Sequence, residues 1–423
     1  MRTKIFSIIL SIVLTVIVDT SVDAATKIKV QMVMGENSPE YVMLTRFAAD
    51  VSALTGGEVK LEILPKIKTT ETKGLLEKIH KGKIGGGFAW THYWSSYHPA
   101  TMLFGSPTAG GGLGYDNISW VAWYLYGGGR ELYKELWSEM GMNIKGIMLQ
   151  PQGPEALGWF QEPIKNMDDF RDYTYRAPPG IPGQAYLDLG VDAVTMGGSE
   201  ILPALKNGTI DAAEWCCPLP DRTFGFQKVL KNYYLQGVHQ NVVNSDLYIN
   251  GDLWKKISPE HQKAIEIAAD ASLIHTIAWR MHENGKALKD LTDNHGVILH
   301  DTPADYFTEY SEAAKNLFSK FNTSSPFFKK VYDSMEKFAQ STVPFWAQAQ
   351  SSNAQIGSAY AKGSMNEQNF SENMIETDEY ESPQSHENFK RDMSQGLTIE
   401  EAKEGLAKKF SVDVHAVEIT IRG

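Results

Sequence analysis

The N-terminal part of the chain alternates between strand and helix patterns, and this alternation restricts the fold to the α/β class. Short apolar or alternating stretches predict strands, and stretches with helical spacing of apolar residues lie between them. The predicted strands are 28–34, 59–64 and 85–89, and the predicted helices are 38–54 and 70–81. Because strand–helix–strand units close with right-handed crossovers, these elements predict a parallel sheet covered by helices.

A second unit of this kind begins near Lys145, and the chain returns to the first near 246–250, where another strand is predicted. Two crossings between two lobes make a hinge, as in binding proteins that close around a ligand. Stretches with helical spacing follow, among them 259–275 and 277–291. The expected boundaries are 25–149 plus about 241–300 for lobe I, 150–240 for lobe II, and 301–363 for C-terminal helices that span the lobes.

The two ends of the chain differ from the lobes. Residues 1–24 have the pattern of a signal peptide, with a basic start, an uncharged apolar run at 5–18 and a small-residue cleavage site before Ala25. This pattern predicts export to the periplasm. Residues 364–387 are polar and acidic and predict a linker, and 388–423 predict a small appended helical module whose role is open.

Charge and missing motifs argue against several functions. The formal net charge of -11 argues against nucleic acid as a partner. The glycine run at 110–114 lacks the Lys-Ser/Thr of a P-loop, so no nucleotide is expected. No G-x-S-x-G nucleophile elbow occurs, and His92 and His98 do not have the spacing that puts two metal ligands on one helical face. A secreted lyase or hydrolase is the alternative class, and a sensor that uses the C-terminal module is another.

The segment 197–221 contains the clearest candidate for a site. A short amphipathic helix stops at Asn207-Gly208, and a buried strand at 210–213 then leads to Glu214 and Trp215. Ligands of open α/β sheets bind at the carboxyl ends of strands, so this pair predicts a small-molecule site. The alternative is an exposed glutamate beside a core tryptophan.

Two adjacent cysteines, Cys216 and Cys217, follow this pair and are the only cysteines of the chain. Adjacent cysteines rarely satisfy disulfide geometry, so two reduced, buried thiols are expected, with a strained vicinal bridge as the alternative.

Four ordered segments resemble the solute receptors of TRAP transporters, the tripartite ATP-independent periplasmic uptake systems. They are ALKNGTIDAAEW at 204–215, FAWTHYWSS at 88–96, GGGREL at 127–132 and GWFQEPIKNMDDFRDYTYRAPPG at 158–180. The resemblance runs from about residue 27 to about residue 350 and is strongest to the branch that binds 2-oxo acids, lactate and related acids. It implies a two-lobed periplasmic binding protein of the type II-like kind. Such a receptor is not an enzyme, and it delivers a small organic acid to separate membrane subunits.

The resemblance also assigns site residues. Arg176 matches the arginine that binds the substrate carboxylate, a role that suits the planar, bidentate guanidinium. Tyr93 and Trp94 match an aromatic pair that forms a wall on the opposite lobe, and the tyrosine hydroxyl can donate to a ligand oxygen. The predicted substrate-binding residues are Arg176, Tyr93, Trp94, Gln152, Glu155 and Trp215.

Some receptors of this branch hold a cation that bridges protein and substrate. Carboxylate, amide and main-chain oxygens suit Ca2+ or Na+. The matching positions are Glu214, the main chain of Trp215, Gln240 and Gln152. The segment 150–157 aligns in more than one way, so Glu155 or Gln150 is an alternative to Gln152, and Asp221 and Asn241 are further polar candidates.

The resemblance also implies that a long C-terminal helix can mediate a homodimer. The aromatic residues that could form such a contact are Phe327, Phe328, Phe345 and Trp346. The alternative is that these side chains pack across the backs of both lobes.

Overall fold

The computed structural model describes residues 25–68, 72, 74–366 and 403. The predicted signal peptide, most of the predicted linker and nearly all of the predicted C-terminal module lie outside the described residues. The chain separates into two compact units, 1–350 and 351–423. Both sheets and the candidate site belong to the first unit, and the described part of the second is almost entirely helix.

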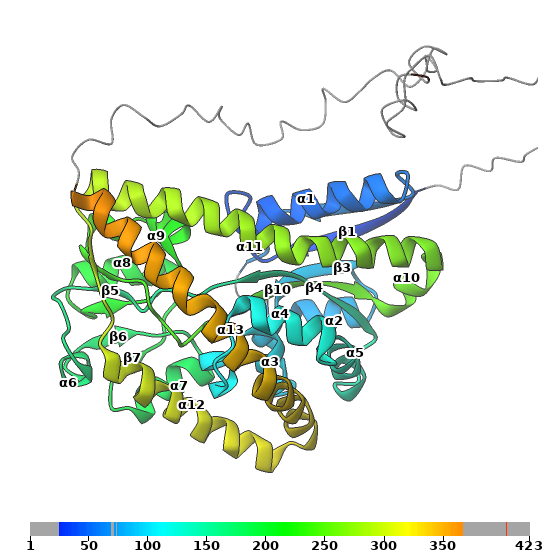
Figure 1. The fold of residues 1–423 in the computed structure, drawn as a ribbon. Helices are drawn as coiled ribbons and strands as arrows, with labels where there is room; N and C mark the ends of the chain where they lie inside the picture. Colours follow the sequence, from blue (N-terminus) through cyan, green and yellow to red (C-terminus); the bar gives the residue numbers. More distant parts are fainter. Residues whose placement is uncertain (1–24, 69–71, 73, 367–402, 404–423) are drawn as a thin grey trace, which may run out of the picture. The chain divides into compact units, whose positions relative to one another are not determined.

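The first sheet has five strands in the order β2-β1-β3-β10-β4 (Figure 1). These strands are β1 (Thr26–Met32), β2 (Val59–Leu64), β3 (Gly86–Trp90), β4 (Ile144–Gln152) and β10 (Val243–Asn250). The first three are mutually parallel, as the sequence predicts, but β10 runs antiparallel to both β3 and β4. The sheet is therefore mixed, because β10 enters it from the opposite direction after the chain has built the second lobe.

The helix α1 (Pro39–Leu54) shows how local sequence determines these elements. Ser38 is its N-cap, and the Ser38 hydroxyl accepts a hydrogen bond of 3.2 Å from the main-chain N–H of Tyr41. Leu44, Phe47 and Val51 recur at helical spacing and are fully or almost fully buried against the sheet. The other helices around this sheet are α2 (Leu75–His80), η2 (Thr91–Trp94), α3 (Thr101–Gly105), η3 (Thr108–Gly112), α4 (Asn117–Tyr126), α5 (Gly129–Glu139) and α10 (Gly251–Lys256).

The second sheet has six strands in the order β11-β9-β5-β8-β6-β7. They are β5 (Gly158–Phe160), β6 (Thr174–Arg176), β7 (Asp192–Val194), β8 (Ala212–Ala213), β9 (Asn232–Tyr234) and β11 (Ile298–His300). The accompanying helices are α6 (Met167–Arg171), α7 (Ile181–Asp188), α8 (Gly198–Lys206), α9 (Pro218–Phe224) and η4 (Phe226–Lys228). Two mixed sheets with helices confirm the predicted two-lobed α/β fold.

The two segments that connect the sheets, 153–157 and 235–242, lie against each other. The main-chain N–H of Glu155 donates to the carbonyl of Gln240 at 3.1 Å. Gly153 has a φ of +111°, and a Cβ there would lie 2.5 Å from the carbonyl oxygen of Asn241. Only glycine adopts this conformation and permits this approach without strain. The connections therefore form a closely packed pair where the chain passes between the sheets.

Long helices follow the second sheet. The helix α11 (Pro259–His295) is one continuous helix of 37 residues that packs on α1 and β4 at one part and on α9 at another (Figure 1). The two stretches of helical spacing, 259–275 and 277–291, are parts of this one helix, because Thr276 between them is buried and helical and the helix ends only at His295, with Gly296 as its C-cap. No described helix is long and apolar enough to span a membrane.

The predicted aromatic contact region lies on α13 (Pro326–Asn366), which follows α12 (Ala304–Ser324). Phe327 and Phe328 are buried, and the indole N–H of Trp346 donates to Asp116 at 2.8 Å. Phe345 is 68% exposed. The region is therefore divided: two of its aromatic side chains belong to the core of the first unit, and Phe345 faces solvent.

Candidate functional site

A buried ion pair lies at the carboxyl ends of two neighbouring strands of the second sheet. Arg176 ends β6, and Glu214 directly follows β8; these strands are parallel, with Arg176 in register with Ala213. The guanidinium Nη1 of Arg176 donates to the carbonyl oxygen of Glu214 at 3.0 Å and pairs with its carboxylate oxygen Oε1. Arg176 is 7% exposed and Glu214 only 1%. The ring of Trp215 lies 5.5 Å from the guanidinium carbon, within cation–π range.

This geometry excludes one of the two interpretations of Glu214 and Trp215. The glutamate is the buried residue and the tryptophan is only half-buried, so an exposed glutamate beside a core tryptophan is wrong. Burial raises the pKa of Glu214, and the positive charge of Arg176 opposes that rise. A carboxylate this deeply buried needs a cationic partner to remain ionised.

The connecting segments add Glu155 and His239 to this pair. One ligand atom each of Glu155, Glu214 and His239 lies within 4.8 Å of the others, and all three side chains are buried. The carboxylate oxygen Oε2 of Glu214 is 3.9 Å from Nε2 of His239. Burial raises the pKa of Glu155 well above its ordinary value, and the neighbouring Glu214 raises it further. Two carboxylates and an imidazole in this arrangement are a donor set for a cation.

His239 is neutral in this environment. Burial lowers the pKa of His239 to about 3, and the positive charge of Arg176 makes a smaller contribution in the same direction. Its Nδ1 lies 3.0 Å from the hydroxyl of Tyr186, while Nε2 has no hydrogen-bond partner among the described residues. His239 therefore presents one satisfied and one unsatisfied nitrogen inside a fully buried site.

The predicted glutamines are all buried but differ in their contacts. The side-chain amide of Gln240 donates to Ser106 at 3.0 Å, and that of Gln150 donates to the carbonyl of Glu40 at 3.2 Å. Gln152 ends β4, and its Oε1 has no hydrogen-bond partner within the described part of the chain. An unsatisfied buried amide oxygen is available as a ligand for a hard cation.

Tyr93 and Trp94 are neighbours in sequence but occupy different environments. The side chain of Tyr93 is 43% exposed, yet desolvation by its surroundings raises its pKa. The negative charges of Glu40 and Glu155 raise this pKa further, and the positive charge of Arg176 lowers it. Water therefore reaches one side of Tyr93, and the charged cluster lies within electrostatic reach. Trp94 is 1% exposed and packs edge-on against Tyr248 in the core of the first lobe, with ring centroids 6.0 Å apart.

Sequence reasoning missed a second buried ion pair. Arg280 on α11 pairs with Glu40 in the first turn of α1, and each is only 4% exposed. The Nε and Nη1 groups of Arg280 have no hydrogen-bond partner among the residues that the structure describes. No local pattern reveals this pair, because its members are 240 positions apart in the chain.

The cysteines and Asp221 form a supporting layer next to the cluster. Cys216 and Cys217 are free and buried as expected, with sulfur atoms 3.3 Å apart. Asp221 accepts hydrogen bonds from the indole of Trp159, the hydroxyl of Tyr233 and the main-chain N–H of Cys216. Burial raises the pKa of Asp221 to about 7. Asp221 is therefore occupied by structural bonds. The other minor candidate, Asn241, donates to the carbonyl of Tyr115 at 3.2 Å.

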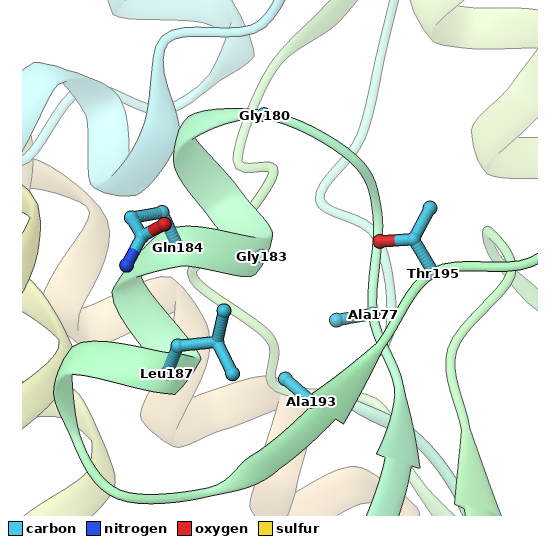
Figure 2. A pocket seen from close by; sticks show the side chains of 7 residues that line it. All are labelled: Ala177, Gly180, Gly183, Gln184, Leu187, Ala193 and Thr195. Atoms are coloured by element: carbon cyan, nitrogen blue, oxygen red, sulfur yellow. The ribbon is translucent and has the colours of Figure 1, made fainter.

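A small cavity of about 160 Å³ lies beside this site but is separate from its charged residues. Figure 2 shows Leu187 of α7 pointing toward Ala193 of β7. The cavity is lined by Ala177, Gly180, Gly183, Gln184, Leu187, Ala193 and Thr195, none of which is charged. The chemistry therefore points to the buried cluster rather than to this cavity.

Two α/β lobes joined by adjacent connections, with a buried arginine and carboxylates at strand ends, define the class of two-lobed solute-binding proteins. The family model for bacterial extracellular solute-binding proteins, family 7 (DctP), matches residues 30–324. The chain belongs to this family of TRAP transport receptors, and it is not an enzyme.

Curated relatives and solved structures agree with this assignment. The monocarboxylate 2-oxoacid-binding periplasmic protein of Nostoc sp. is 25% identical over 69% of this chain and 78% of its own length. The sialic acid-binding periplasmic protein of Vibrio cholerae is 26% identical over 59% of this chain and 77% of its own.

Among solved structures, this chain is similar to a TRAP transporter solute-binding protein from Bordetella bronchiseptica, with a TM-score of 0.71. That structure is a dimer with calcium and picolinate in one site. It is 23% identical and covers 82% of this chain and 100% of its own. The receptor from Pseudoalteromonas atlantica, with bound sodium and pyruvate, has a TM-score of 0.69 and 23% identity over 79% and 99% of the two chains.

Proposed function

We propose that this TRAP receptor captures a small organic acid, a 2-oxo or 2-hydroxy monocarboxylate, between its lobes in the periplasm and delivers it to separate membrane subunits. The observation that carries the proposal is Arg176. Its guanidinium is buried at a strand end, and its Nε has no hydrogen-bond partner among the described residues. A ligand carboxylate would satisfy this N–H and form a charge-assisted hydrogen bond, while Glu214 holds the other side of the guanidinium.

The candidate binding residues come from both lobes and from the connections, which supports capture of the ligand between the lobes. Arg176, Glu214 and Trp215 come from the second lobe, Tyr93 follows β3 of the first, and Glu155 and His239 come from the connections. Such a distribution favours closure around a ligand, because movement at the connections changes the distance between Tyr93 and Arg176. We propose the lobe boundaries 25–149 plus about 241–300 and 150–240 on this basis, with one correction: β11 (Ile298–His300) pairs with β9 and so belongs to the second lobe.

The relatives support the choice of acid. The Nostoc protein is described as binding monocarboxylate 2-oxo acids, and the Pseudoalteromonas protein holds pyruvate beside sodium. A third receptor, from Colwellia psychrerythraea, holds pyruvate beside calcium. A 2-oxo or 2-hydroxy acid has two adjacent oxygens, so one molecule can contact an arginine and a cation together.

The residues present fit a bridging cation. Glu155 and Glu214 are buried carboxylates with raised pKa values, and the Oε1 of Gln152 is buried without a hydrogen-bond partner among the described residues. The residues proposed from the sequence to hold the cation are Glu214, the main chain of Trp215, Gln240 and Gln152. A bound cation would supply the positive charge that keeps both carboxylates ionised.

A thermal-shift screen of the purified chain against organic acids tests this function. A ligand that binds only the native state stabilises it by RT ln(1 + [L]/Kd), which is roughly 2.7 kcal/mol at 100-fold over Kd. We expect 2-oxo and 2-hydroxy monocarboxylates to raise the melting temperature and a chelator to reduce the effect of any divalent cation. Arg176→Ala should abolish the shift while the circular dichroism spectrum stays unchanged. An undiminished shift in that variant would rule out the proposed site.

A further inference from the structure

Two adjacent thiols directly follow the binding residues of the second lobe. Cys216 and Cys217 come after Glu214 and Trp215 without a gap, and both are free thiols. They are 6% and 4% exposed, and their sulfur atoms lie 3.3 Å apart. Resting on the proposed function, we propose that this pair is a modification site for small disulfides, which convert the two thiols into a vicinal disulfide that weakens the binding of the cargo.

The modification is a thiol–disulfide exchange in two steps. The thiolate of one cysteine attacks a sulfur of the small disulfide, such as oxidised glutathione, and one reduced thiol leaves. The other cysteine then attacks the mixed disulfide, and the second reduced thiol leaves. The cysteines lose two electrons and two protons in total, and the small disulfide gains both, so no other reactant is needed. The predicted export to the periplasm would bring the chain into an oxidising compartment.

A bridge between adjacent cysteines forces the main chain to move. Neighbouring Cα atoms lie about 3.8 Å apart across a trans peptide bond. Cysteines in a disulfide usually have Cα atoms about 4.4–6.8 Å apart. The peptide unit between Cys216 and Cys217 must therefore twist as the bridge closes, and the resulting strain makes the bridge easy to reduce again. Such a bridge is suited to reversible modification rather than to permanent stabilisation.

The peptide unit that twists also holds the connecting segment 153–157. The carbonyl oxygen of Cys216 accepts a hydrogen bond of 2.7 Å from the main-chain N–H of Ala156. This carbonyl belongs to the peptide unit between the two cysteines, so its direction changes when the bridge forms. The bonds from Cys216 N–H to Asp221 at 3.1 Å and from Asp221 N–H to the carbonyl of Cys217 at 3.0 Å lie outside that unit. We therefore expect the bond from Ala156 to be the one that breaks.

The residues on both sides of this hydrogen bond belong to the candidate site. Ala156 directly follows Glu155 of the buried cluster. Cys216 directly follows Trp215, whose ring lies 5.5 Å from the guanidinium carbon of Arg176. Loss of the bond therefore loosens Glu155 and Trp215 together, while Arg176 stays at the end of β6. The bridged chain should remain folded but bind its cargo more weakly.

Bound cargo and the bridge should oppose each other. If the bridged form binds the cargo tenfold more weakly, the cargo makes formation of the bridge tenfold less favourable, because the two equilibria are linked. Access acts in the same direction, since Cys216 and Cys217 are buried and a small disulfide reaches them only when the site opens. The empty receptor is then the form that is modified, and the loaded receptor is protected.

Intact-mass spectrometry of the purified chain tests whether the bridge forms. After incubation with oxidised glutathione, we expect a mass lower by two hydrogen atoms and no thiol that reacts with an alkylating reagent in denaturant. Dithiothreitol should restore both thiols, and saturating pyruvate should slow formation of the bridge. A stable mixed disulfide with glutathione, or two thiols that stay free at every concentration of the oxidant, would overturn the inference.

Calorimetric titration of pyruvate, with Ca2+ present, measures the effect of the bridge on binding. We expect the bridged chain to bind pyruvate tenfold or more weakly than the reduced chain, roughly 1.4 kcal/mol, and dithiothreitol to restore the affinity. The double variant Cys216→Ser, Cys217→Ser is the control, and its affinity should be the same before and after treatment with oxidised glutathione. Equal affinity of the bridged and reduced chains, or an equal loss in the treated double variant, would overturn the inference.

The two assays distinguish failure of the inference from failure of the proposed function. The mass measurement needs no cargo, and the pyruvate affinity of the reduced chain needs no bridge. If the reduced chain binds pyruvate and the bridge either does not form or does not change the affinity, only the inference is overturned. If the reduced chain binds no 2-oxo or 2-hydroxy acid, the proposed function is refuted, and the effect of the bridge on cargo is refuted with it.

Discussion

Replacement of Arg176 by methionine should cost stability as well as binding, and the cost should depend on pH. Methionine fills much of the space of the arginine but leaves the carboxylate of Glu214, 1% exposed, without its cation. Removal of one partner from a buried ion pair typically costs about 3–5 kcal/mol, because the other charge remains buried and unpaired. We expect a loss of this size in the free energy of unfolding at pH 8, measured by urea denaturation in the absence of ligand.

The same loss should be smaller at pH 5. Burial already raises the folded-state pKa of Glu214 above its ordinary value of 4.5, and Arg176 is what opposes that rise. In the variant, the folded-state pKa of Glu214 rises further because Arg176 is missing. Over this pH range Glu214 therefore keeps its proton in the folded chain and releases it in the unfolded chain. Stability then falls as pH increases from about 4.5 through the folded-state pKa. Below this window the carboxyl group is neutral and the missing arginine costs little.

A matched control is the exposed pair of Lys330 and Glu135, whose nitrogen and oxygen are 2.6 Å apart and whose side chains are 54% and 42% exposed. Lys330→Met should cost at most about 1 kcal/mol at either pH, as is typical of surface ion pairs. If Arg176→Met costs as little as Lys330→Met, or loses the same amount at pH 5 and pH 8, the reasoning about an unpaired buried carboxylate is refuted.

Two further predictions concern stability. Burial raises the pKa of Asp246 to about 8, so the unaltered chain should lose stability between about pH 4 and pH 8, on the order of 1.4 kcal/mol per pH unit from this group. Asp246→Asn should remove that loss and be the more stable protein at pH 8 in urea denaturation; parallel pH profiles would contradict this. The Asn244 amide nitrogen donates to Oδ1 of Asp246, and in the variant a turn of the Asn244 side chain replaces this bond with one from the new amide to Asn244 Oδ1, which has no partner among the described residues. Gly158→Ala should destabilise by about 2 kcal/mol or more, because φ is +122° and the new Cβ would lie 2.4 Å from the carbonyl oxygen of Ala213. Gly208→Ala, at φ +74° with no neighbour within 4 Å, is its control and should cost only about 1 kcal/mol; similar melting temperatures for both would show that the close contact does not matter.

The sequence could predict the elements that depend on local patterns. The cap at Ser38 and the spacing of Leu44, Phe47 and Val51 determine α1 from adjacent residues alone. The direction of β10 could not be predicted in this way, because it depends on where the chain re-enters the first sheet. The continuity of α11 through Thr276 depends on burial against other parts of the fold, which local spacing does not reveal.

The candidate site likewise contains some residues that the sequence reveals and others that it does not. Arg176 and Glu214 were found because each ends or follows a strand in a segment that resembles a known family, and the structure pairs them. His239 was not assigned a role, although its neighbour Gln240 was. The contact of His239 with Tyr186 joins residues 53 positions apart, and the pair of Glu40 and Arg280 joins residues still further apart. Such groups become a site only when the lobes and the long helix bring them together.

Calorimetric titration of pyruvate into the purified chain, with a divalent cation present, tests the central claim most directly. The account predicts saturable binding of a single pyruvate per chain that is lost in Arg176→Ala, while the circular dichroism spectrum of the variant is unchanged. Binding that is undiminished in Arg176→Ala, or the absence of binding for pyruvate and every related monocarboxylate with any cation, would contradict it.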